Sequence, residues 1–241
     1  MLTGSMCTGS VRYWAAALAA GTVIIDPDER RLPLRHSHHR YCILGPNGVQ
    51  KLTVPIEGDT AGMATPMREV RISEHGNWRR LHWGALYSAY GRTPYFDHIA
   101  PELEDIIVGG QQTHLLELNT QLQQLIVDFT ALPIEFVYGS PIAQTASSQE
   151  GGCKSPSNDE VIDLRGKIDG KKPDRLPIVD TPYYQVWAER YGFVPQLSVL
   201  DLLMNEGREA IFTLMRMGNG WQDCVGTAPL CRPPAGLQKC D

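Results

Sequence analysis

The order of the predicted elements places this chain in the α+β class, as a single domain. Strand-like runs, including an Asn-Gly hairpin, fill much of the first third, whereas apolar residues recur at helical spacing from residue 77 onward. Strands come first and helices follow, instead of alternating along the chain, and this order favours α+β over a sheet of alternating parallel units.

The first elements are a helix and a strand. Val11–Gly21 is apolar and resembles the core of a secretory signal, but no basic segment precedes it and Arg12 lies inside it. It is also too short to span a bilayer, so we predict a helix packed on the core. Thr22–Asp26 is a short β-branched run that ends in turn formers, which predicts a strand.

A β-hairpin is the strongest local prediction. Two strand-like runs in Arg40–Ile56 flank Pro46-Asn47-Gly48, and Asn-Gly tolerates positive φ at both central positions of a tight turn. Glu69–Ser73 is predicted to add a further strand.

Helices dominate the remainder. Periodicity predicts a first helix from Asn77 to about residue 90. A second helix is predicted after Thr93-Pro94 and stops at Gly109-Gly110, and a third, amphipathic helix covers Thr113–Leu132. Two more elements, Tyr183–Phe193 and Leu197–Met215, close the domain. Ser198 is placed to cap the last of them.

The domain is predicted to cover residues 1–217, with a mobile insertion at about 142–175. Gln144–Glu160 is small, polar and rich in turn formers, and Gly166–Arg175 is strongly charged. Residues 218–241 hold Gly, Pro and Cys without a period, so we predict a poorly ordered tail.

Composition narrows the classes of function. The chain has 241 residues and a formal net charge of -5, and no basic stripe suits a phosphate backbone, which excludes a nucleic-acid partner. The six cysteines are scattered without CxxC spacing, which favours reduced thiols in a cytoplasmic protein. No dinucleotide, P-loop, GxSxG or HExxH motif is present, and the sequence specifies no cofactor.

Several blocks, in order, resemble the WbqC-like protein family. They include "GSVRYWAAALAA", "RYCILGPNG", "LHWGALYSAYGRTPYF", "DLR", "YYQVW" and "LSVLDLLMNEG", and they span Gly9 to Leu214. This bacterial family is tied to gene clusters for O-antigen and other surface polysaccharides. The resemblance implies a role in polysaccharide biosynthesis, beside other enzymes of that synthesis, with glycine or another aminoacyl group transferred to a nucleotide-linked amino sugar.

The sequence departs from the family pattern before the hairpin. Family members carry Lys-Gln-Ser/Thr-Tyr-Arg-Asn-Arg-Cys there, and only Ser37, Arg40 and Cys42 keep their residue types. The loss of the lysine puts the chemistry of this segment in doubt. Met204 replaces a common Phe before Asn-Glu-Gly, which is a mild change.

The chemistry of amide formation selects candidate site residues from these blocks. His82 is the candidate base, because imidazole titrates near working pH, and Asp201 and Glu206 are candidate acidic groups for the amine. Arg165 is a candidate diphosphate clamp on a lid. The other candidate substrate-binding residues are Arg40, Trp78, Trp83, Tyr90, Tyr95, Tyr184, Gln185 and Asn205.

Alternatives remain open for each group. Trp, Tyr and His at helical spacing also fit a packed core, and Asp201, Asn205 and Glu206 also fit a helix-end hydrogen-bond network. His36, His38 and His39 could bind a transition metal if they lie on a strand, but a solvated segment fits better, and no metal is assigned. The alternative function is a non-catalytic sugar-binding or scaffold protein of a polysaccharide biosynthesis complex.

Overall fold

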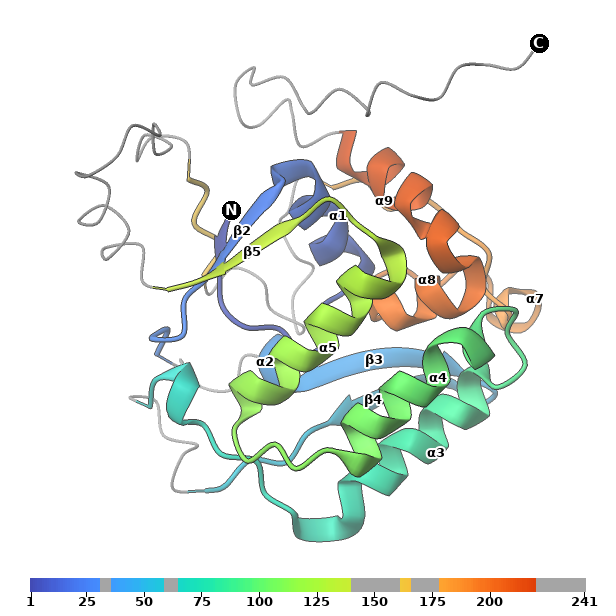
Figure 1. Cartoon of the computed structure of the whole chain (residues 1–241). Coiled ribbons are helices and arrows are strands. Elements are labelled where there is room, and N and C mark those ends of the chain that lie inside the picture. Colours follow the sequence, from blue (N-terminus) through green and yellow to red (C-terminus); the bar gives the residue numbers. More distant parts are fainter. Residues whose placement is uncertain (31–35, 59–64, 140–160, 166–177, 220–241) are drawn as a thin grey trace.

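A computed structural model describes residues 1–30, 36–58, 65–139, 161–165 and 178–219. Within the described residues, all strands but β5 (Glu135–Tyr138) lie in the first 53 residues and helices prevail after them, which confirms the α+β class (Figure 1). One cluster of buried apolar side chains extends from Met1 to Met217. Most of the expected insertion, and the tail from residue 220, lie outside the described residues.

A small parallel sheet forms the N-terminal layer. Its strands are β1 (Leu2–Thr3), β2 (Thr22–Ile25) and β5 (Glu135–Tyr138), in the order β1-β2-β5, and Asp163 extends it through a parallel bridge to Leu2. The sequence predicted β2 but neither β1 nor β5. The two residues of β1 are too few to show an alternating pattern, whereas β2 was recognised from its β-branched residues.

Helix α1 (Val11–Ala20) crosses from β1 to β2. It starts at Ser10, whose hydroxyl accepts a hydrogen bond from the Tyr13 amide at 3.1 Å. It ends at Gly21, where φ is +70° and a side chain would be strained. The predicted helix is confirmed, and its first seven residues are buried.

The predicted hairpin is confirmed as β3 (Arg40–Gly45) and β4 (Gly48–Thr53), paired in antiparallel register. The turn itself differs from the prediction: its two central residues are Pro46 and Asn47, and of the Asn-Gly pair only Gly48 has positive φ. Proline at the first central position and glycine after the second are typical of a type I turn.

Two interpretations in this region are wrong: His38 and His39 are buried, not solvated, and Glu69–Ser73 is not a strand. The histidine segment forms a helical turn, α2 (His36–His39), so alternate imidazoles do not share a strand face. Around Glu69–Ser73 the chain forms the 3₁₀ turn η1 (Met67–Glu69), followed by single bridges of Arg71 and Ile72.

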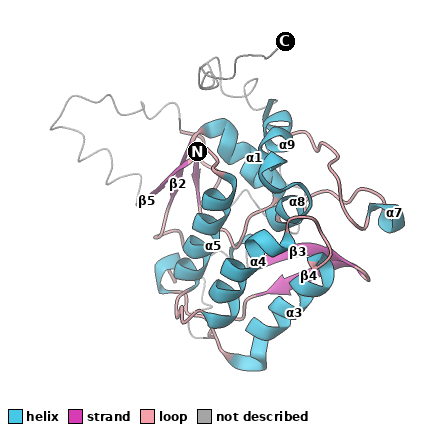
Figure 2. Cartoon of the chain, turned by 45° about the vertical axis from the view of Figure 1, so that its right-hand side comes forward, coloured by secondary structure: helices cyan, strands magenta, loops and turns pink. Residues whose placement is uncertain are grey.

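Three predicted helices are confirmed as α3 (Trp78–Tyr90), α4 (Phe96–Glu104) and α5 (Leu115–Thr130). The 3₁₀ turn η2 (His75–Asn77) precedes α3, and α4 continues into a π-helical turn, η3 (Asp105–Gly109). Figure 2 shows α5 between the parallel sheet on one side and the hairpin with α3 and α4 on the other.

The C-terminal elements differ from the prediction. Only α7 (Ala188–Tyr191) is helical in the 183–193 segment. The expected single helix over Leu197–Met215 is two helices, α8 (Val199–Glu206) and α9 (Ala210–Gly218), separated by the 3₁₀ turn η5 (Gly207–Glu209). Gly207 breaks the helix with φ of +59°. The cap is confirmed, since the Ser198 hydroxyl accepts from the Leu200 amide at 3.2 Å.

Across the described ranges, no helix combines the length and apolar character needed to cross a bilayer.

Candidate ligand-binding groove

A groove of about 630 Å³ lies where the turn between α8 and α9 meets two segments from elsewhere in the chain. Tyr95, at the start of α4, and Tyr184, before α7, form one side of it. The lining residues are Tyr95, Tyr184, Asn205, Glu206, Glu209, Phe212, Thr213, Met215, Arg216 and Asn219.

Apolar side chains stand exposed on the walls of this groove. Tyr184 is 60% exposed, Phe212 64% and Met215 51%. A single exposed apolar side chain is ordinary, but several around one hollow mark a binding surface. The groove therefore offers flat apolar faces to a ligand.

Opposite charges are held in place by one hydroxyl. Thr213 donates to the Glu206 carboxylate at 2.7 Å and accepts from the Arg216 guanidinium at 2.8 Å. Glu209 adds a second carboxylate to the lining. Anionic and cationic groups thus occupy set positions in the same hollow.

Asp201 lies behind the groove and is 1% exposed. Its carboxylate accepts from the Tyr183 hydroxyl at 2.8 Å and from the Gln185 amide at 3.1 Å. Burial raises the pKa of Asp201 to about 6, against hydrogen bonds from Tyr183, Tyr90 and Gln185 that lower it. Asp201 and Gln185 therefore support the groove from inside and do not line it.

Asn205 joins this buried layer to the groove. Its side-chain amide donates to the Asp201 carbonyl at 2.7 Å and accepts from the Val186 backbone at 3.1 Å. This second bond ties the segment that carries Tyr184 to helix α8. Tyr90 is also buried, and its hydroxyl accepts from the Leu44 amide at 3.3 Å.

The turn at Gly207 is shaped by Tyr95. A Cβ atom at Gly207 would overlap the Tyr95 ring, and the Tyr95 amide donates to the Met204 carbonyl at 3.2 Å. The absence of a side chain at Gly207 lets the aromatic ring lie against the backbone beside Glu206.

The structure thus gathers four candidate residues, Tyr95, Tyr184, Asn205 and Glu206, on one lining. The sequence reading missed Glu209, Phe212, Thr213 and Arg216. The spacing in the "IFTLMR" run of α9 was a usable pattern. Phe212 and Met215 lie three positions apart and are both exposed, whereas Leu214 is buried. One-sided exposure at that spacing became evident only once the helix break at Gly207 was known.

His82 lies elsewhere, between α3 and the hairpin. Its ring nitrogens form hydrogen bonds with the Tyr41 hydroxyl at 3.2 Å and with the Thr53 carbonyl at 3.1 Å. Burial lowers the pKa of His82 to about 4, although the Thr53 bond raises it. Because the Thr53 carbonyl can only accept, Nε2 carries the proton. His82 is thus placed to hold the helix to the hairpin, and the lining of the groove does not include it.

Of the two candidate tryptophans of α3, Trp78 is buried and Trp83 is half-buried against the core. Trp78 is 5% exposed and meets the His82 ring edge-on, with centroids 5.0 Å apart. Trp83 stacks on Phe96 of α4 at 6.0 Å. Neither lines the groove, so the concentration of aromatics in this helix is explained by its contacts with the hairpin and α4.

The basic candidates do not line the groove either. Arg165 forms ion pairs with Asp26 at 2.6 Å and with Asp163 at 2.8 Å, and Arg40 is half-buried at the start of β3. His38 and His39 are buried. Within the described residues, no group of three or more His, Cys, Asp or Glu is arranged to hold a metal ion.

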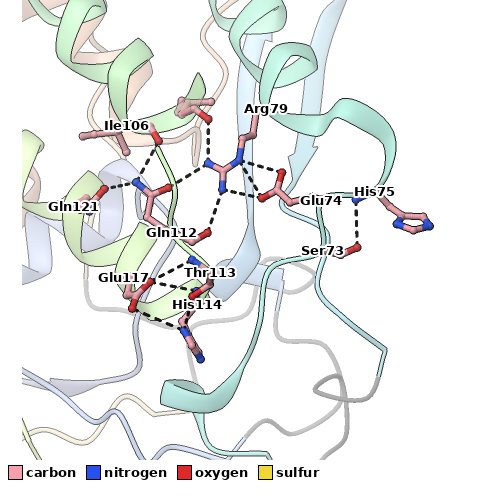
Figure 3. Close-up of polar contacts among 11 residues, drawn as sticks. Ser73, Glu74, His75, Arg79, Ile106, Gln112, Thr113, His114, Glu117 and Gln121 are labelled. Atoms are coloured by element: carbon pink, nitrogen blue, oxygen red, sulfur yellow. Dashed lines mark hydrogen bonds and ion pairs between the residues drawn. The ribbon is translucent and has the colours of Figure 1, made fainter. Parts of the chain in front are cut away.

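A second cavity, of about 690 Å³, is bordered by Arg79. Figure 3 shows the polar contacts of Arg79. All three guanidinium nitrogens already donate within the chain: to the Glu74 carboxylate, to the Ile107 carbonyl, and to the side chain and carbonyl of Gln112. Gln112 in turn donates to Gln121 and to the Ile106 carbonyl. Arg79 therefore joins α3 to the end of η3 and has no donor left for a ligand.

Arg79→Met is expected to lower the free energy of unfolding by about 2–4 kcal/mol, because buried acceptors on Gln112 and Ile107 lose their donors. Arg80→Met, one residue away on the exposed face, is the matched control and should change it by less than about 0.5 kcal/mol. Urea denaturation measures both. Equal stability of the two variants would contradict the anchoring role.

The fold and the groove define a small α+β protein with a charged, aromatic-walled groove as its candidate ligand site. Its sequence matches the WbqC-like protein family over residues 13–172, more than half of the 241 residues. The chain belongs to the WbqC-like protein family. It is also similar to the uncharacterized protein Rv1507c of Mycobacterium tuberculosis, with 27% identity over 197 residues, which cover 76% of this chain and 83% of the mycobacterial protein. No solved structure matches it.

Proposed function

We propose that the groove binds a nucleotide-linked amino sugar and that the protein acts in surface-polysaccharide biosynthesis as an aminoacyl transferase. Family membership supports the pathway, since WbqC-like proteins are tied to O-antigen and related gene clusters. Other enzymes of polysaccharide synthesis are then the expected partners, and the cytoplasm is the expected compartment.

The observation that carries the proposal is that the Thr213 hydroxyl holds Glu206 and Arg216, of opposite charge, between the exposed apolar side chains of the groove. Glu206 and Glu209 suit the ammonium group of an amino sugar, and Arg216 suits the diphosphate. Tyr184 and Phe212 offer flat faces to the ring and attract a cation placed over them. A neutral sugar would leave the two carboxylates without a positive partner.

Acyl transfer requires the amine in its neutral form. In the proposed reaction the Glu206 carboxylate accepts a proton from the ammonium group, and the freed nitrogen attacks the carbonyl carbon of an activated aminoacyl donor. An amide bond forms as the leaving group of the donor departs. Thr213 keeps Glu206 oriented during this transfer.

A non-catalytic sugar-binding or scaffold role is the second candidate. One observation favours it: the lining of the groove includes no Cys, Ser or His, and the Thr213 hydroxyl is engaged between Glu206 and Arg216. An acyl-enzyme intermediate at this lining therefore has no evident nucleophile. A binding protein would hold the sugar with full affinity and show no turnover with any activated aminoacyl donor.

Isothermal titration with UDP-glucosamine and UDP-glucose tests the binding proposal. Wild-type protein should prefer the amino sugar, and Glu206→Gln should remove that preference with a loss of about tenfold in affinity. Arg216→Gln should weaken both ligands. Arg208→Gln is the control, because Arg208 is exposed and bonds to the Phe129 carbonyl away from the groove. Equal affinity of the wild-type protein for both ligands, or unchanged binding in Glu206→Gln, would contradict the proposal.

A further inference from the structure

Tyr184 forms an exposed wall of the groove, yet its two neighbours in the chain are buried. Tyr184 is 60% exposed, whereas Tyr183 is 9% and Gln185 2% exposed. Among the described residues, the backbone from Thr181 to Tyr184 forms no hydrogen bond with other backbone groups. The place of Tyr184 on the groove therefore depends on how the side chains of Tyr183 and Gln185 are held.

One carboxylate oxygen holds both neighbours. The Tyr183 hydroxyl donates to Oδ2 of Asp201 at 2.8 Å, and the Gln185 side-chain amide donates to the same atom at 3.1 Å. The orientation of the Gln185 amide is fixed, because its nitrogen also donates to the Val194 carbonyl and its oxygen accepts from the Val194 amide, both at 2.9 Å. Asp201 is thus joined to the chain on both sides of Tyr184, without lining the groove itself.

The groups that are bonded to Asp201 are donors, which suits its ionised form. Besides Tyr183 and Gln185, the Tyr90 hydroxyl of α3 is bonded to this carboxylate. It accepts from the Leu44 amide, so its hydrogen can point at Asp201. Hydrogen bonds to a charged acceptor are roughly twice as strong as those between neutral groups. A proton on Asp201 removes the charge and makes one oxygen a hydroxyl, which then needs an acceptor among these donors.

Asp201 is the member of this cluster that titrates near neutral pH. Burial raises its pKa to about 6, although its hydrogen bonds lower it. Within the described residues, the titratable groups that face it are Tyr90 and Tyr183, and burial raises the pKa of both hydroxyls well above the ordinary value of 10. Neither ionises where Asp201 changes charge. Glu206 of the groove also acts on Tyr183, so it needs a control of its own.

We propose that Asp201 is a positioning residue of the groove: its ionised carboxylate holds Tyr183 and Gln185, and thereby keeps Tyr184 in the place where the ligand binds. Protonation weakens this hold, so the groove binds its ligand more tightly when Asp201 is ionised than when it is neutral. By linkage, a bound ligand favours the ionised form by the same factor. This role rests on the groove being the ligand site proposed above, and it adds a regulation by pH.

Nuclear magnetic resonance of the ligand-free full chain with isotope-labelled tyrosine tests whether Asp201 positions Tyr184, and Tyr184→Phe identifies the ring signal. In the wild type this signal should move as the pH falls, with a midpoint at about 6. Asp201→Asn is a neutral isostere of the protonated carboxyl. Its Tyr184 signal should stay where the wild-type signal lies at low pH, and Glu206→Gln should keep the wild-type response.

Titration with UDP-glucosamine tests the consequence for binding. At about pH 7.5 Asp201→Asn should bind about tenfold more weakly than the wild type, as a linked pKa shift of about one unit implies, and the two affinities should converge at about pH 5. In urea at about pH 7.5 the variant should be no less stable than the wild type, because it removes a buried charge. A merely structural role would lower stability and affinity together.

Tyr183→Phe is a second variant, which decides if Asp201→Asn does not fold. It removes one donor to Asp201 and leaves the lining of the groove intact. Because the hydrogen bond from Tyr183 lowers the pKa of Asp201, its loss should move the midpoint of the Tyr184 signal to a higher pH. An unchanged midpoint would contradict the role of Asp201.

A Tyr184 signal that ignores pH in the wild type, or responds equally in Asp201→Asn, would overturn the proposal. Equal and measurable affinity of the two proteins at about pH 7.5 would overturn it as well. If UDP-glucosamine binds neither protein, the groove function fails, and the ligand-free signal still decides whether Asp201 positions Tyr184. The two failures are therefore distinguishable.

Discussion

Gly207→Ala is expected to lower the free energy of unfolding by about 2–4 kcal/mol and to abolish ligand binding in the groove. The residue has φ of +59°, which is unfavourable for any side chain, and an added Cβ would overlap the Tyr95 ring. The Tyr95 amide is bonded to the Met204 carbonyl, which holds the backbone, so the overlap is relieved by moving the ring. The ring would be displaced from beside Glu206, where the proposed substrate amine binds.

Gly84→Ala is the matched control. Gly84 lies in α3 with no atom within 4 Å of an added Cβ, so alanine should stabilise the helix by roughly 0.5–1 kcal/mol. Urea denaturation and titration with UDP-glucosamine measure both variants. A Gly207→Ala protein as stable as the wild type, with its binding intact, would mean that Tyr95 does not shape the groove.

Asp201→Asn is expected to change how stability depends on pH. The folded-state pKa of about 6 lies above the ordinary value of 3.8, so the folded protein holds more protons than the unfolded chain between these values. This contribution is fully present below about pH 4 and is lost as the pH rises to 6, by at most about 3 kcal/mol. Asparagine can still accept from Tyr183 and Gln185, and it does not titrate.

His82 acts in the opposite direction. Its folded-state pKa of about 4 lies below the ordinary 6.5, so stability from His82 rises as the pH rises through the same interval. The two contributions largely offset each other in the wild-type protein. Asp201→Asn should uncover the His82 contribution as a stability that increases by up to about 3 kcal/mol between pH 4 and 6.5.

Urea denaturation at several pH values measures this difference between the wild type and Asp201→Asn. His82→Gln is the complementary variant, and its stability should fall over the interval. Parallel pH profiles for the wild type and Asp201→Asn would show that the Asp201 carboxyl is not desolvated as the structure indicates.

Periodicity and turn chemistry were sufficient to predict the hairpin and helices α1, α3, α4 and α5. They did not identify β1, whose two residues are too few to show alternation, or β5, and they failed where one residue interrupts an otherwise continuous pattern. Gly207 lies in a run with helical spacing on both sides, and the break there depends on its positive φ and on the Tyr95 ring packed against it.

Part of the candidate site could also be predicted from the sequence. The resemblance singled out Tyr95, Tyr184 and Glu206, which are distant in sequence, but it could not show that they share a groove. His82 was chosen because of its usual pKa, and burial is invisible in a sequence. Its burial between α3 and the hairpin lowers the pKa, against the hydrogen bond to the Thr53 carbonyl, which raises it.

The central claim is that the groove between α8, α9 and Tyr184 binds a nucleotide-linked amino sugar. Mapping of backbone amide signals by nuclear magnetic resonance during titration with UDP-glucosamine tests it most directly. The account predicts saturable shifts concentrated at Tyr95, Tyr184 and residues 205–216. Shifts absent from these residues, or centred on another part of the molecule, would contradict it.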